Sequence, residues 1–131
     1  MKRGTIWGRE VCMQGGPIAY VVYRKAFGGD LARDILDAYR DGDVTVEQFL
    51  RFAWTMARTH DPATSDYEAW LGEFDPEMFS LADSPVEVID SAICAELFRI
   101  RPTGRAARLA KRIRGALSRW LGRLSQRLGA A

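Results

Sequence analysis

The chain has 131 residues, of which 47% are hydrophobic and 27% are charged, and its formal net charge is +2. This length and this balance indicate one globular domain with a core of its own, and they exclude a disordered or fibrous chain. No apolar run is long enough to span a bilayer, and no apolar segment follows the basic start at Met1-Lys2-Arg3, so we expect a cytoplasmic protein.

The small net charge hides a division along the chain. Residues 103–131 contain eight basic residues and no acid, whereas residues 1–102 contain 11 basic and 17 acidic residues, a net charge of −6. An acidic body therefore carries a basic tail. We expect two units in a mainly α protein: a helical body with a short N-terminal hairpin over residues 1–102, and a basic amphipathic C-terminal helix over residues 103–131.

The body begins with a predicted β-hairpin and two predicted helices. Residues 5–7 and 10–13 are typical of short strands around a turn at Gly8-Arg9. Residues 18–27 are ambiguous, because their aromatic and β-branched residues favour a strand while the glycine pair after them favours a capped helix; we expect the helix. Asp30 is expected to cap the next helix, which would bury Leu31, Ile35, Ala38 and Tyr39.

The stretch from Thr45 to Glu73 is expected to hold the core, as two helices around a polar break. Thr45 with Gln48, and Ser65 with Glu68, each fit a capping box. A further turn of helix is predicted at residues 75–81, and a last body helix from Ser84 up to Pro102. The expected core residues are Phe49, Leu50, Trp54, Trp70, Leu71, Ile89, Ile93 and Leu97.

No pattern in the sequence points to catalysis or to a cofactor. The one histidine, His60, has no phosphate loop, nucleophile motif or metal-ligand cluster beside it, so we expect a surface or capping role and no enzyme. Residues 37–48 follow the spacing of a calcium-binding loop, but Tyr39 and Gln48 stand where two acidic ligands are needed, so we expect a plain turn. Cys12 and Cys94 are expected to be reduced and buried.

The tail segment 105–128 is predicted to form an amphipathic helix with arginines opposite its apolar face. Gly115 and Gly122 each cost such a helix about 1 kcal/mol, so it needs a surface on which to fold. We expect it to dock on an apolar groove of the same chain or of a second copy. Binding to an anionic membrane surface or to nucleic acid stays an alternative. The residues predicted to bind a partner are Ile113, Leu117, Trp120, Leu121, Leu124 and Leu128.

A succession of short motifs runs through residues 14–99. Gly16-Pro17-Ile18, residues 23–31, residues 52–57 and residues 67–74 follow one another in an order and spacing that resemble the tail assembly chaperones of long, non-contractile-tailed phages, such as the G protein of lambda-like phages. The hairpin before Gly15 and the segment after Pro102 are not part of the resemblance. The motif residues are Tyr23, Arg24, Phe27, Gly28, Asp30, Trp54, Met56, Trp70, Leu71 and Phe74.

The resemblance implies a small helical protein without a catalytic site. Such chaperones bind the tape measure protein, a long and helix-rich chain, and keep it soluble in the host cytoplasm while tail tube subunits assemble around it. A longer form made by frameshifting would recruit the tail tube protein, and homo-oligomers are compatible with this role. The alternative function is a small cytoplasmic adaptor that holds a membrane surface or nucleic acid through residues 105–128.

Overall fold

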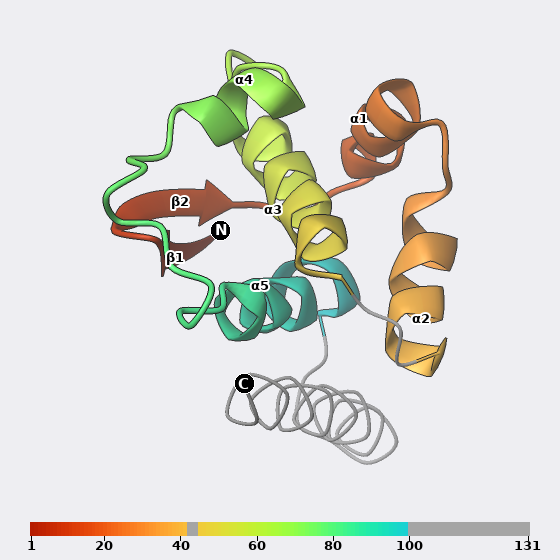
Figure 1. Cartoon of the computed structure of the whole chain (residues 1–131). Coiled ribbons are helices and arrows are strands. Elements are labelled where there is room, and N and C mark those ends of the chain that lie inside the picture. Colours follow the sequence, from red (N-terminus) through yellow and green to blue (C-terminus); the bar gives the residue numbers. More distant parts are fainter. Residues whose placement is uncertain (42–44, 100–131) are drawn as a thin grey trace.

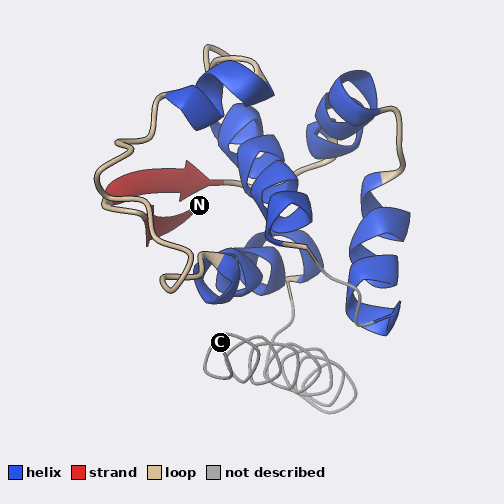
Figure 2. Ribbon diagram, in the orientation of Figure 1, coloured by secondary structure: helices blue, strands red, loops and turns tan. Residues whose placement is uncertain are grey.

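The computed structural model describes residues 1–41 and 45–99, which form a β-hairpin followed by helices (Figures 1 and 2). For this part of the chain, the mainly helical fold with an N-terminal hairpin is confirmed. The helix expected at residues 103–131, and the partner-binding residues assigned to it, lie outside the described residues. The elements are β1 (Lys2–Ile6), β2 (Arg9–Met13), α1 (Ile18–Phe27), α2 (Leu31–Asp41), α3 (Val46–His60), α4 (Tyr67–Gly72), α5 (Val86–Ala92) and a π-helical stretch, η1 (Ile93–Phe98).

The hairpin packs on two helices, the central helix α3 and the last helix of the body, α5. β1 and β2 pair antiparallel, and each residue of one strand faces one residue of the other without a bulge. Trp7 and Gly8 form the turn with positive φ angles of 46° and 78°. β2 packs on α3 and β1 packs on α5. A Cβ at Gly4 would lie 2.3 Å from Cγ1 of Val88, so the missing side chain is what allows β1 to approach α5 so closely.

α3 is the central element of the body (Figure 1). Its N-cap is confirmed, because Oγ1 of Thr45 accepts the N–H of Gln48 at 3.1 Å. The side chain of Gln48 does not complete the capping box; its amide donates to the hydroxyl of Tyr23 at 2.9 Å and so ties α3 to α1. The hairpin, α1 and α5 all pack on α3. Eight residues of α3 are consequently buried, which is more than one helical face can hold.

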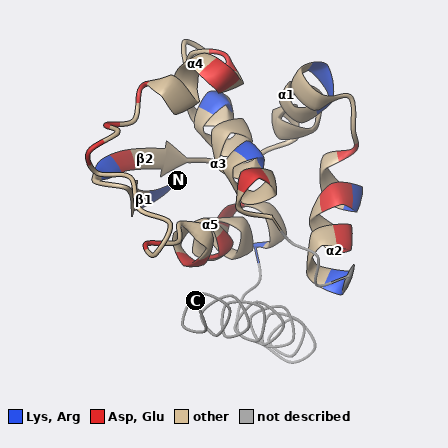
Figure 3. Cartoon of the chain, viewed as in Figure 1, with Lys and Arg blue, Asp and Glu red and all other residues tan. Residues whose placement is uncertain are grey.

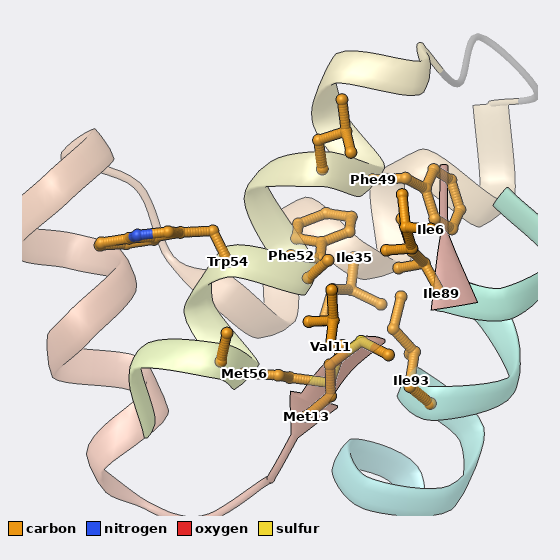
Figure 4. Packing of buried hydrophobic residues seen from close by; sticks show 14 of the residues in the cluster. Ile6, Val11, Met13, Ile35, Phe49, Phe52, Trp54, Met56, Ile89 and Ile93 are labelled. Carbon is orange, nitrogen blue, oxygen red and sulfur yellow. The ribbon is translucent and has the colours of Figure 1, made fainter. Parts of the chain in front are cut away.

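The core is one continuous cluster, and Figure 4 shows side chains from the hairpin, α2, α3, α5 and η1 meeting in it. Leu71 and Leu97 were wrong as core residues: both are partly buried and pack against the edge of the cluster. Leu97 instead lines the groove described below. The other six expected core residues are confirmed as buried: Phe49, Leu50, Trp54, Trp70, Ile89 and Ile93.

Two local expectations between α3 and α5 were wrong for the same reason, which is competition from distant partners. The second capping box does not form, because the hydroxyl of Ser65 bonds to the carboxylate of Glu73 and α4 starts after Asp66. Residues 75–81 do not form a turn of α-helix. Hydrogen-bonded turns form at residues 75–78 and 80–83 instead. The indole N–H of Trp7 donates to two carbonyls of the second turn.

The last body helix begins one residue later than expected, with Pro85 in place of Ser84 at the N-cap position, and it ends early. α5 starts at Val86, whose N–H donates to Oγ of Ser84 at 3.3 Å. After Ala92 the helix widens into η1, a change that the sequence pattern does not predict. Arg99, at a φ of 49°, ends η1, so the helix stops short of the proline that was expected to end it.

Candidate binding groove

An apolar groove of about 260 Å³ lies between α1, α2 and η1. Three segments that are distant in sequence supply its walls, so it exists only in the folded body. The large apolar side chains of its lining are Tyr20 from α1, Leu31, Ile35 and Leu36 from α2, and Leu97 and Phe98 from η1.

Local sequence signals place the first two walls. Gly28 ends α1 in the left-handed conformation, with a φ of 77°, and its N–H bonds to the carbonyl of Arg24 at 2.8 Å. Oδ1 of Asp30 then accepts the N–H of Arg33 at 2.8 Å and starts α2, as the sequence predicts. The connection between the two helices is therefore short and fixed at both ends, and it packs α1 against α2.

Gly15 allows the third wall to close. A Cβ at this buried position would lie 2.0 Å from the backbone oxygen of Glu96 in η1, a distance that no side chain can occupy. The segment that enters α1 therefore lies directly against η1. Any other residue at position 15 would push η1 away and open the groove.

The groove has a buried floor and an exposed rim. Leu31 and Ile35 form the floor and are each only 3% exposed. Tyr20 and Leu36 stand at the rim with 52% and 43% of their surface exposed. Large exposed apolar side chains grouped in this way make the groove a candidate contact site. An apolar side chain inserted between them would touch both rim and floor.

The groove offers little unbalanced charge. Glu96 lies at its edge, is 9% exposed, and pairs with the amino group of Met1. Arg99 is the other charged residue of the lining and is exposed. A partner would therefore be recognised mainly by its apolar surface and shape.

Several motif residues of the phage-chaperone resemblance hold together the helices beside this groove. Tyr23 is 1% exposed, and its hydroxyl donates to Oδ2 of Asp34 on α2 at 2.6 Å. Burial, together with this carboxylate, raises the pKa of Tyr23 to about 12. Because Tyr23 also accepts from Gln48, one phenol links α1, α2 and α3. Arg24, its neighbour, is exposed.

A second group of motif residues joins α1, α3 and α4 through aromatic contacts. The ring of Phe27 lies 5.5 Å from that of Trp54 and 5.2 Å from that of Tyr67. The guanidinium of Arg51 covers Phe27 at 5.1 Å. The indole N–H of Trp54 donates to the carbonyl of Ser65 at 2.8 Å, so this tryptophan is both packed and hydrogen-bonded.

The remaining motif residues lie between α4 and the hairpin. Trp70 and Phe74 are buried with their rings 5.0 Å apart, and the guanidinium of Arg9 lies 4.9 Å from the ring of Phe74. The hydroxyl of Ser65, and Arg9 with it, hold the pKa of Glu73 below its usual value. Met56 on α3 is completely buried.

Tyr23, Gly28 and Asp30 thus position the helices of the groove, and none of the motif residues lines it. Sequence reasoning did not identify its exposed rim residues, Tyr20 and Leu36. One signal could have found Leu36, because it falls off the stripe of buried residues on α2 and is apolar nevertheless. The η1 wall has no such signal.

The histidine and the two cysteines lie outside the groove. His60 is exposed, and its Nδ1 lies 3.1 Å from Oε1 of Gln14. Within residues 1–41 and 45–99, no group of three His, Cys, Asp or Glu residues could hold a metal ion. The calcium-loop pattern at residues 37–48 extends beyond the described residues, so its inactivity stays a prediction. Neither cysteine forms a disulfide within the described part of the chain; Cys94 is buried, as expected, while Cys12 is only partly buried.

None of the helices in the described part of the chain is long and apolar enough to cross a membrane. Comparisons with protein-family models, with curated proteins and with solved structures find no match to this chain.

Proposed function

We propose that this protein is a phage tail assembly chaperone whose groove between α1, α2 and η1 binds apolar helical segments of a tape measure protein. The observation that carries the proposal is the apolar groove itself, with the exposed side chains of Tyr20 and Leu36 at its rim. An amphipathic helix that lays its apolar face into a hydrophobic groove is a common mode of peptide recognition.

The size of the groove suits a weak, repeated contact. A volume of about 260 Å³ accepts one or two large side chains, so a single segment would bind weakly. A long apolar chain offers many such segments, and many copies of a small binder can cover it. Repeated weak contacts of this kind keep the chain soluble and still allow the binders to leave when tube subunits arrive.

The motif resemblance supports the same site. The motif residues Tyr23, Gly28 and Asp30 fix the ends and the packing of the two helices that form the groove. Recruitment of the tail tube protein by a longer frameshifted form, and action in the host cytoplasm, belong to this proposal.

The proposal is tested by co-expression of the full chain with the tape measure protein of the same gene cluster. Tyr20→Asp combined with Leu36→Asp places two charges on the rim, and we expect the soluble, co-purifying tape measure protein to fall at least tenfold. Both residues are exposed, so the free energy of unfolding should change by only about 0.5 kcal/mol.

Leu81→Asp is the matched control, because Leu81 is 76% exposed and lies outside the groove. It should leave tape measure binding unchanged. Equal binding by the rim variant and the natural chain would refute the groove as the site. If the chain instead binds anionic vesicles or RNA, and loses this on replacement of Arg119, Arg123 and Arg127 by Gln, the adaptor function replaces the chaperone.

A further inference from the structure

A second apolar surface lies on the connection between α4 and α5. We call residues 75–83 the acidic loop. Its Met78, Phe79 and Leu81 are 52%, 51% and 76% exposed, which makes Leu81 the most exposed large hydrophobic residue in the described chain. Apolar groups held in water in this way are typical of a contact surface.

The acidic loop has a fixed shape although it contains no helix or strand. The indole N–H of Trp7 donates to the carbonyls of Ser80 and Asp83, at 3.2 and 2.9 Å. The ring of Trp7 also lies 5.0 Å from that of Phe79. The N–H of Met78 bonds to the carbonyl of Asp75 at 3.0 Å and closes a separate turn. A surface that is already ordered loses little entropy when a partner binds.

The charge of this region has one sign. Between Arg58 and Arg99 the chain contains ten acidic residues and no lysine or arginine. Figure 3 shows the acidic residues along the connection from α4 to α5 and on α5 itself. Four exposed carboxylates lie on or next to the acidic loop and make no ion pair with a described residue: Asp75, Glu77, Asp83 and Glu87.

We infer that the acidic loop and the exposed face of α5 form the docking surface for residues 105–128 of the same chain. From Arg99 to the end, the sequence has ten basic residues and no acid, the reverse of the preceding forty residues. The predicted helix offers leucines and a tryptophan to Met78 and Leu81, and arginines to the carboxylates around them. Apolar contact and charge thus match at one surface.

The length of the chain allows this return. The acidic loop lies at the start of α5 and Arg99 follows the end of η1, so one helical run of roughly 20 Å separates them. A helix over residues 105–128 would be roughly 36 Å long and, running back along α5, would reach the loop. The short tether gives the segment a high effective concentration beside its own body, which favours the same chain over a second copy.

The face of α5 that lies between is suited to a helix. Glu87 on α5 and Ala95 on η1 are exposed and Ser91 on α5 is partly so, each four residues from the next. Two of these are small, which allows a close approach, and one is acidic. The groove is the poorer site for an arginine-rich helix, because its one acid is already paired and Arg99 adds a positive charge.

This inference does not depend on the proposed function. It assigns the tail to its own body and leaves the groove free for a partner. The tape measure protein and residues 105–128 would then bind at two different surfaces without competing.

The test uses the full chain with the photo-crosslinking residue p-benzoylphenylalanine in place of Leu81. After irradiation we expect a product that migrates as a monomer, in which mass spectrometry finds residue 81 joined to a peptide within residues 105–128. Met78→Ser together with Glu77→Lys should lower this yield at least fivefold. The body should stay folded, because both residues are exposed, while the helical circular dichroism signal should fall as residues 105–128 lose the surface on which they fold.

The matched control carries p-benzoylphenylalanine in place of Leu36, at the rim of the groove. It should give at most one fifth of the crosslink to residues 105–128. Equal or greater yield there would place the tail in the groove and overturn the inference. A product of dimer size from position 81 would make a second copy the occupant, and crosslinks only outside residues 105–128 would exclude the tail; either result overturns the same-chain assignment.

Discussion

The apolar residues of α3 and those of the two exposed surfaces are of the same kinds but differ in their surroundings. Phe49, Phe52 and Met56 are completely buried, because the hairpin, α1 and α5 enclose α3. Leu36 and Leu81 lie where no described element covers them. The first set should determine whether the chain folds, and the second what it binds. Substitutions that separate stability from binding test this division.

The largest effect is expected for Trp54→Ala. Trp54 is 3% exposed, packs on Phe27, and donates a hydrogen bond to Ser65. Its loss should lower the free energy of unfolding by about 3–5 kcal/mol, measured by urea denaturation. Leu36→Ala, at a groove residue that is 43% exposed, should change it by about 0.5 kcal/mol or less. Similar losses in the free energy of unfolding for the two variants would contradict the distinction between buried and exposed apolar residues.

A smaller loss of stability is expected when one buried hydroxyl is removed. Tyr39 is 7% exposed, and its hydroxyl donates to Oδ1 of Asp90 at 2.6 Å, while Asp90 is itself 8% exposed. Tyr39→Phe keeps the ring and removes this donor from a buried carboxylate, so it should cost about 1–3 kcal/mol in thermal or urea denaturation. Tyr20→Phe, at an exposed ring, is the control and should leave stability unchanged. Equal effects at the two positions would show that the Tyr39 hydrogen bond contributes nothing.

The smallest effect is expected in alkaline solution. The pKa of Tyr23 is raised to about 12 in the folded protein from an ordinary value of 10, because burial and Asp34 disfavour the phenolate. Folding thus favours the protonated phenol, so its contribution is complete below pH 10 and is lost as the pH rises to about 12. Ultraviolet titration of tyrosinate should show a late-ionising group that is missing in Tyr23→Phe, besides Tyr67, whose pKa burial also raises. Asp34→Asn should lower its pKa, and an unchanged titration would exclude the carboxylate as a cause.

The sequence was sufficient where a local signal decides the structure. Three groups each satisfy a backbone group within a few residues: the hydroxyl of Thr45, the glycine after α1 and the carboxylate of Asp30. The end of α1 and the starts of α2 and α3 could therefore be predicted. The same rules resolved the ambiguous residues 18–27 in favour of the helix.

The sequence was insufficient where a distant partner decides. Ser65 is bound by Glu73 instead of capping α4, and Trp7 fixes residues 80–83 as a turn. The groove has the same origin, since its third wall is η1, brought to α1 by the close approach at Gly15. Such contacts depend on the whole fold, and local propensity does not contain them.

The contact between the hairpin turn and the acidic loop also has a consequence for the order of folding. Trp7 and Ser80 are 73 residues apart in sequence, yet one hydrogen bond joins them. An isolated hairpin is marginal in water, so β1 and β2 gain their stability only when α3 and α5 cover them. Contacts of such long sequence separation slow folding, because the loop must close before they form. Although β1 precedes the described helices in the chain, it is thus among the last of these elements to reach its final place.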